Sequence, residues 1–171
     1  MKSLLLIIVL LVGCSESSRT LPKTAPALPD PGDIEHSLEA FNGTLVGTNN
    51  GEWGGELLFV TKAGDIDVLV KDNVHGIIKN DAGIFAFTGL THLTGNRGHI
   101  FRVSQEDFGD IHATDLGELP GAPSNVHQLP DGNTTFLMFM GDWTDQNKEI
   151  YECFELVGKN VINSLRCKPP R

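Results

Sequence analysis

Residues 74–111, VHGIIKNDAGIFAFTGLTHLTGNRGHIFRVSQEDFGDI, decide the fold of this chain. In this stretch short runs of β-branched and aromatic residues alternate with clusters of Gly, Asn and Asp, and helical periodicity is almost absent. Such runs predict short β-strands that are separated by tight turns. The same pattern extends in both directions along the chain, so we expect an all-β domain.

The pattern recurs in three units, which begin near Ile34, Val74 and Val126. Each unit opens with a histidine, passes through a turn to a strand that ends in glycine, and reaches a third strand twelve residues later. The histidines are His36, His75 and His127, the glycines are Gly47, Gly89 and Gly141, and the third strands contain Phe59, Phe101 and Cys153. A turn reading Gly-Asp-Ile at 64–66 and 109–111, and Gly-Lys-Asn at 158–160, leads to a fourth strand. We therefore expect about three four-stranded antiparallel repeats.

Four strands per unit, with histidines 39 and 52 residues apart, resemble the blades of β-propellers over about residues 33–167. The resemblance implies sheets that are arranged around an axis. Propellers usually close with about 4–8 blades, which leaves three arrangements for this chain. Two copies pair as a homodimer, the units form an open curved array, or the fold is a β-sandwich or open barrel.

The first fourteen residues, MKSLLLIIVLLVGC, have the features of an export signal. Lys2 supplies a positive charge, and the apolar run at 4–12 is too short to span a bilayer but suits a signal peptide. The tetrad LVGC that ends at Cys14 resembles the lipobox of bacterial lipoproteins. The resemblance implies lipidation of Cys14, cleavage before it, and membrane anchoring. Ser15 in the next position is similar to an outer-membrane sorting context and implies an anchor that faces the periplasm.

The chain divides into three parts on composition. Residues 1–13 form the signal peptide, and residues 14–32 form the lipidated cysteine and a flexible Pro- and Ser-rich tether, because this segment cannot bury a core. Residues 33–171 form one all-β repeat domain.

Cys153 and Cys167 are expected to form a disulfide, which an exported compartment permits. If 148–157 and 160–167 are strands of one hairpin, the two cysteines are equidistant from residue 160 and face each other. Directly opposed strand residues have Cβ atoms about 4.5–5.5 Å apart, close enough for a bridge. Two free thiols are the alternative.

The chain is acidic, with a formal net charge of −9 that becomes −10 once the signal peptide and its Lys2 are removed. This charge argues against nucleic acid and anionic membrane surfaces as partners. It suits a basic protein partner, and it also keeps a domain soluble.

Two groups of residues suggest metals without matching a known site. His36, His75 and His127 could converge on zinc, but a residue that recurs once per repeat more often stabilises the fold. The segment 141–149 carries Asp142, Asp145, Asn147 and Glu149, whose oxygens could hold calcium, although the segment does not match an EF-hand. We expect no metal and no other cofactor.

Trp53, His92 and Trp143 follow the glycines of the three units and form the candidate binding loops. If the units share one orientation, these loops gather at one end of the domain. Aromatic residues beside polar ones are typical of binding surfaces, but they also serve as buried loop anchors.

No catalytic motif is present, so the first hypothesis is a non-enzymatic protein-binding module of the cell envelope. A sharper version is an immunity protein or inhibitor of a wall-degrading effector, because an acidic surface speeds capture of a basic enzyme. The alternatives are a structural or assembly lipoprotein of the outer membrane and an enzyme that acts on carbohydrate or peptidoglycan.

Overall fold

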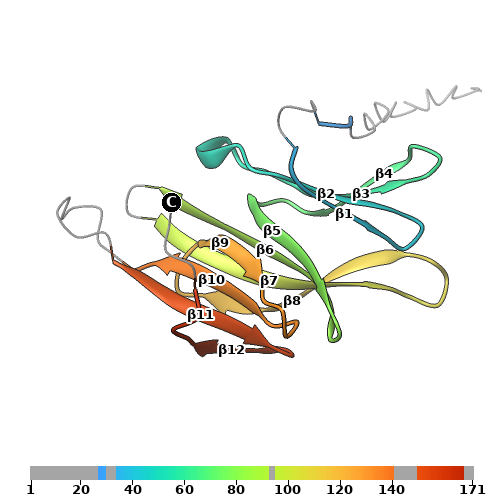
Figure 1. The fold of residues 1–171 in the computed structure, drawn as a ribbon. Helices are drawn as coiled ribbons and strands as arrows, with labels where there is room; N and C mark the ends of the chain where they lie inside the picture. The colour runs from blue at the N-terminus through green and yellow to red at the C-terminus, as the bar shows by residue number, and fades with distance from the viewer. Residues whose placement is uncertain (1–26, 30–33, 93–94, 141–149, 168–171) are drawn as a thin grey trace, which may run out of the picture.

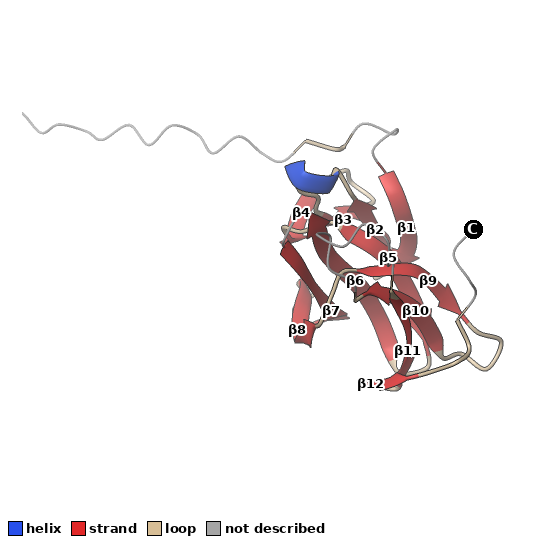
Figure 2. Ribbon diagram, turned by 90° about the vertical axis from the view of Figure 1, so that its left-hand side faces the viewer, coloured by secondary structure: helices blue, strands red, loops and turns tan. Residues whose placement is uncertain are grey.

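The computed structural model describes residues 27–29, 34–92, 95–140 and 150–167 (Figure 1). Strands make up most of this part of the chain, which contains one short 3-10 helix and no α-helix (Figure 2). The elements are β1 Ile34–Ala40, β2 Gly43–Thr48, η1 Gly51–Trp53, β3 Leu57–Thr61, β4 Ile66–Val70, β5 Val74–Asn80, β6 Gly83–His92, β7 Gly95–Gln105, β8 Ile111–Leu119, β9 Pro123–Gln128, β10 Thr134–Phe139, β11 Tyr151–Val157 and β12 Asn160–Asn163. Within the described ranges, no helix is long and apolar enough to cross a membrane.

The strands form three antiparallel sheets of four strands each, and none of them closes into a barrel. The first sheet contains β1 to β4, the second β5 to β8 and the third β9 to β12, each as an up-and-down meander. The prediction of an all-β chain with three four-stranded repeats is confirmed. The third unit, however, begins at Pro123 rather than near Val126.

The repeated Gly-Asp-Ile turns form for a conformational reason. Gly64 and Gly109 have φ values of 93° and 95°, a region that only glycine enters without strain. Each amide donates to the carbonyl three residues earlier, in Thr61 at 3.0 Å and in Glu106 at 2.9 Å. This is the three-residue hairpin loop with glycine in the left-handed position, and each following isoleucine begins the outermost strand, β4 or β8.

The second sheet lies between the other two and is covered on both faces (Figure 1). One apolar cluster joins it to the first sheet and includes Leu45 and Phe59 of the first sheet with Ile84 and Val103 of the second. The other cluster joins it to the third sheet. Its members are Phe85, Phe87, Ile100, Leu119, Phe136, Met138, Phe154 and Leu156.

The inner strands β1, β5 and β9 lie next to one another in succession, as in consecutive propeller blades. Glycines make this approach possible. A Cβ on Gly47 would lie 2.5 Å from Val74 Cγ1, and a Cβ on Gly76 would lie 2.8 Å from Val126 Cβ. Both distances are too short for carbon atoms, so each glycine sets the spacing between one sheet and the next.

The three repeat histidines are not equivalent, which corrects the sequence interpretation. Both opening strands have a register shift, between Ile34 and His36 in β1 and between Val74 and Gly76 in β5. His36 is the first residue paired after the shift, whereas His75 lies within it, so Gly76 takes the place of His36 in the second unit. The recurrence of histidine in the sequence therefore does not mark equivalent positions.

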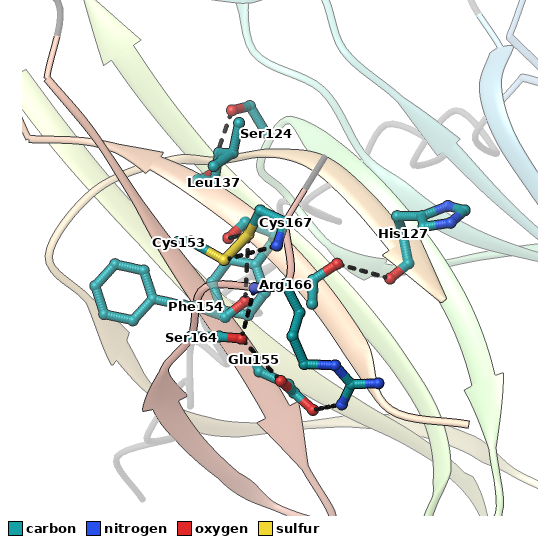
Figure 3. Close-up of a disulfide and its surroundings, with 11 residues drawn as sticks. Ser124, His127, Leu137, Cys153, Phe154, Glu155, Ser164, Arg166 and Cys167 are labelled. Carbon is teal, nitrogen blue, oxygen red and sulfur yellow. Dashed lines mark hydrogen bonds and ion pairs between the residues drawn. A yellow bond between two sulfur atoms is a disulfide. The ribbon is translucent and has the colours of Figure 1, made fainter. Parts of the chain in front are cut away.

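Cys153 and Cys167 form a disulfide with their Cα atoms 5.7 Å apart, as predicted (Figure 3). The expected hairpin geometry is wrong, because β12 ends at Asn163 and the amide of Ser164 donates to the carbonyl of Cys153 at 2.9 Å. The chain then turns back, and the Cys167 amide lies 3.1 Å from the Cys153 sulfur. We call residues 164–167 the C-terminal strap.

Candidate functional site

The loops after β2 and β6 lie at the same end of the domain, as the sequence predicted for Trp53 and His92. Trp53 is in η1 and is 86% exposed. Its neighbour Glu52 places a carboxylate oxygen 3.1 Å from His92 Nε2, so the two loops approach each other. Trp143 and the candidate calcium segment 141–149 lie outside the described residues.

A pocket of about 300 Å³ opens at this end, where the three sheets meet. The first sheet contributes the loop around Asn49 and Gly51, and the second contributes His75 and the end of β6. The third contributes β9 and the ring pair of Phe139 and Tyr151, whose centroids lie 5.6 Å apart. The full lining is Asn49, Gly51, Asn73, His75, Gly89, Leu90, Thr91, Ala122, Pro123, Ser124, Phe139 and Tyr151. No single repeat could form this pocket alone.

Asn73, in the connection between the first two sheets, holds the Trp53 loop in place. Its side-chain amide donates to the Gly51 carbonyl at 2.7 Å and accepts from the Asn50 amide at 3.1 Å. The neighbouring Asp72 is 8% exposed and binds both terminal nitrogens of Arg97, at 2.6 and 3.1 Å. Because a bidentate pair fixes both orientation and position, the connection is clamped to β7.

Asn96 holds the opposite side of the pocket in place through hydrogen bonds of its side chain. Its side-chain oxygen accepts from Thr91 Oγ1 and from the Ala122 amide, each at 2.9 Å. Its nitrogen donates to the Phe139 carbonyl at 2.7 Å. One side chain thereby fixes the β6–β7 hairpin, the connection to β9 and the end of β10, so the pocket walls are held before any ligand arrives.

His75 is the one of the three repeat histidines that lines the pocket. Its Nε2 lies 3.0 Å from the Gly89 carbonyl. A carbonyl can only accept, so Nε2 carries the proton, and Nδ1 of a neutral ring is an acceptor. His127 lies elsewhere on β9, and its backbone carbonyl accepts from Thr135 Oγ1 at 3.4 Å. In the part of the chain that the structure describes, no three His, Cys, Asp or Glu residues are grouped as metal ligands.

His36 is half-buried on β1, and its pKa lies below the ordinary value of 6.5. Burial is the main cause, Glu35 opposes it, and the charge of His75 adds to it. We predict that this histidine makes the fold sensitive to acid. Because the unfolded chain binds the proton more readily, the free energy of unfolding should fall as pH drops from 6.5 through the folded-state pKa.

The measurement is an NMR titration of the His36 ring, together with urea unfolding on both sides of pH 6.5. His36→Gln should remove this part of the pH dependence and leave stability above pH 6.5 nearly unchanged. A His36 pKa at or above 6.5 would contradict the prediction.

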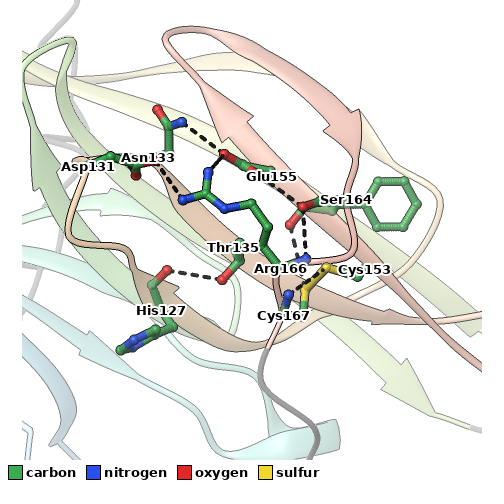
Figure 4. A network of polar contacts seen from close by, with 10 residues as sticks. His127, Asp131, Asn133, Thr135, Cys153, Glu155, Ser164, Arg166 and Cys167 are labelled. Atoms are coloured by element: carbon green, nitrogen blue, oxygen red, sulfur yellow. Dashed lines mark hydrogen bonds and ion pairs between the residues drawn. A yellow bond between two sulfur atoms is a disulfide. The ribbon is translucent and has the colours of Figure 1, made fainter.

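A second polar cluster fastens the C-terminal strap to the third sheet (Figure 4). Glu155 is 4% exposed and accepts from Asn133 Nδ2, Ser164 Oγ and Arg166 Nη1 at 2.8, 2.9 and 2.8 Å. The other terminal nitrogen of Arg166 lies 2.6 Å from Asp131 Oδ2. Its hydrogen bond holds the pKa of Asp131 below the ordinary 3.8. This cluster gives the outer face of the third sheet the polar character of a terminal repeat.

Sequence reasoning identified the loop end but missed Asn73 and Asn96, which build its pocket. In the sequence both lie in stretches rich in Asn and Gly, a composition that is typical of turns. Such a composition does not indicate which residues the asparagines contact. The register of the strands, which the sequence does not fix, decides what they contact.

Comparison of the chain with models of known protein families, with curated proteins and with solved structures finds no match.

Proposed function

We propose that this protein is a lipid-anchored protein of the bacterial cell envelope, whose repeat domain binds a protein partner through its loop end and catalyses no reaction. The observation that carries the proposal is Trp53, which is 86% exposed in η1, the loop whose first residue, Gly51, lines the pocket built by all three sheets. Exposed aromatic residues beside a preformed pocket are typical of the energetic centre of protein interfaces.

The anchor is proposed from the LVGC tetrad at Cys14, with the outer membrane as its site and the periplasm as the side it faces. The Pro- and Ser-rich composition of residues 15–32 suits a tether between this anchor and the domain. A tethered domain meets partners near the membrane without being embedded in it.

Replacing Cys14 with serine should abolish lipid attachment. We expect the Cys14→Ser protein to incorporate no labelled fatty acid and to leave the membrane fraction, whereas a Ser15→Ala control stays labelled. Equal labelling of Cys14→Ser and the unchanged protein would rule out this anchor.

The partner is proposed to be a basic protein, with a wall-degrading enzyme as the leading kind, which would make this chain its inhibitor or immunity protein. The support is the formal charge of −10 after removal of the signal peptide. Complementary charge raises the rate of association more than the final affinity, which suits a protein that must intercept a toxic enzyme.

Affinity capture tests this proposal. The mature protein is immobilised and exposed to envelope and secreted fractions, and bound proteins are identified by mass spectrometry. The expected result is enrichment of one basic wall-degrading enzyme that loses activity when the protein is added. Enrichment of outer-membrane assembly proteins alone, or of nothing, would overturn it.

A further inference from the structure

The pocket at the loop end has an almost uncharged lining. Its described lining residues include no Asp, Glu, Lys or Arg, and His75 is the one titratable side chain besides the Tyr151 phenol. Burying a charge without a partner costs several kcal/mol, and a neutral polar group needs a hydrogen-bond partner. The part of a ligand that enters this pocket should therefore be uncharged.

The shape and walls favour an aromatic ring. A volume of about 300 Å³ is at the lower end for ligand pockets and fits one side chain rather than an extended molecule. Phe139 and Tyr151 meet at an angle of 67°, and Tyr151, which is 39% exposed, gives this wall an accessible aromatic surface. Leu90, Ala122 and Pro123 complete an apolar wall.

The pocket also offers acceptors for one polar hydrogen. Nδ1 of a neutral His75 ring accepts, because Nε2 donates to the Gly89 carbonyl. The Thr91 hydroxyl donates its own hydrogen to Asn96, which leaves its oxygen as an acceptor. Tryptophan and tyrosine carry one such hydrogen on an otherwise apolar ring, and they require a partner for it when buried.

An acidic residue lies next to the pocket lining in the chain. Glu52 directly follows the lining residue Gly51, its side chain is 48% exposed, and its carboxylate lies 3.1 Å from His92 Nε2. The nearby Arg97 is neutralised by Asp72. A positive charge next to the aromatic ring would therefore meet a carboxylate at the rim.

We propose that the pocket takes a single tryptophan or tyrosine side chain of the protein partner, flanked in the partner's sequence by lysine or arginine. This rests on the proposed function, since it names the group through which the protein partner is held.

Three capped tripeptides test the proposal by saturation-transfer NMR with the mature protein. They are Lys-Trp-Lys, Glu-Trp-Glu and Lys-Ala-Lys, with N-acetylglucosamine as a fourth probe. The expected result is saturation of the indole protons of Lys-Trp-Lys, a weaker signal from Glu-Trp-Glu and none from Lys-Ala-Lys. No signal from Lys-Trp-Lys, or an equal signal from Glu-Trp-Glu, would overturn the proposal. Saturation of the sugar without the tryptophan peptide would assign the pocket to carbohydrate and also overturn it.

Variants show whether the signal comes from this pocket. Ser124→Phe places a ring in the pocket and should reduce the Lys-Trp-Lys signal about tenfold. Glu52→Gln removes the carboxylate charge but keeps the shape of the side chain, and it should reduce the signal about threefold, the scale of an exposed ion pair. Phe108→Ala, an exposed aromatic residue in the β7–β8 turn, should change nothing. A signal that persists in both Ser124→Phe and Glu52→Gln would contradict the proposal even if one variant folds poorly.

The capture experiment separates this proposal from the proposed function. A partner captured equally by the unchanged protein and by folded Ser124→Phe would preserve protein binding and overturn the aromatic anchor. Failure of capture with both would remove the proposed function itself.

Discussion

Gly47→Val should destabilise the protein by about 3 kcal/mol, at the upper end for overpacked interiors. The new Cβ would lie 2.5 Å from Cγ1 and 2.8 Å from Cβ of Val74, which is fully buried. Because Val74 is stiff about χ1, its side chain cannot turn away from the new Cβ. The first sheet must therefore move away from the second, which opens the apolar cluster between them. Urea unfolding measures the loss.

Two further variants isolate the cause. Gly95→Val is the matched control, because the nearest atom to a Cβ there is the His92 carbonyl oxygen, at an ordinary 3.4 Å. It should change the unfolding midpoint little. Adding Val74→Ala to Gly47→Val should recover part of the loss, since the two sites then couple. Equal midpoints for Gly47→Val and Gly95→Val would refute this account of sheet spacing.

Arg166→Ala is the second large effect, with an expected clear fall in the urea unfolding midpoint. Removing one partner of an ion pair whose other member is buried leaves that charge only partly compensated, here by the hydrogen bonds from Asn133 and Ser164. Glu155 is 4% exposed, but Arg166 is about half exposed, so water replaces part of its contribution. The disulfide still holds the strap near the sheet, and the loss therefore reports the charge rather than detachment of the chain.

The double variant Glu155→Gln, Arg166→Ala provides the check. Glutamine keeps the shape of the side chain without its charge, so the double variant should be more stable than Arg166→Ala alone. If both are equally unstable, packing of the arginine stem accounts for the effect. NMR should also show the Asp131 pKa rising towards 3.8 in Arg166→Ala, because its hydrogen bond to Arg166 is lost.

The same cluster has a pH dependence of known sign. The pKa of Asp131 is lower in the folded protein than its ordinary value. The contribution of its pairing with Arg166 to stability is therefore present above the ordinary value and is lost as pH falls through the folded-state pKa.

The division into repeats could be predicted because local chemistry determines it. Gly64 and Gly109 are needed wherever their turns occur, and β-branched and aromatic runs form strands regardless of what covers them. The pairing of Cys153 with Cys167 was also predictable, because the anchor accounts for Cys14 and an exported compartment permits disulfides. The predicted hairpin geometry was wrong, because β12 ends at Asn163 and the chain bends at Leu165 before it reaches Cys167.

The register within each sheet could not be predicted. In the first hairpin, Asn42-Gly43 resembles a turn centre, yet Phe41 and Asn42 occupy it, with φ values of 52° and 61°. Gly43 lies in β2 instead, where a Cβ would lie 2.5 Å from Cζ of the Phe59 ring. A contact with a residue sixteen positions away therefore decides the hairpin. The register shifts in β1 and β5 could not be predicted either, and they place His36 and His75 at different positions of their hairpins.

The candidate site was predictable only as a location. The order of strands places the Trp53 and His92 loops at one end, because every unit runs in the same direction. The pocket at this end depends on contacts across the sheets, such as those of Asn96 with Ala122 and Phe139. These contacts join residues that are far apart in the chain, so no local sequence pattern predicts them.

The central claim, that the loop end binds a protein partner, is tested most directly by comparing two exposed aromatic residues at opposite ends of the domain. Trp53 is 86% exposed in η1, and Phe108 is 96% exposed in the β7–β8 turn at the other end (Figure 1). The measurement is the amount of the envelope protein captured by Trp53→Ala and by Phe108→Ala, relative to the unchanged protein. We predict that Trp53→Ala loses about tenfold or more of the captured protein, as for a central interface residue, while Phe108→Ala retains it. Equal capture by both variants, or loss only with Phe108→Ala, would contradict binding at the loop end.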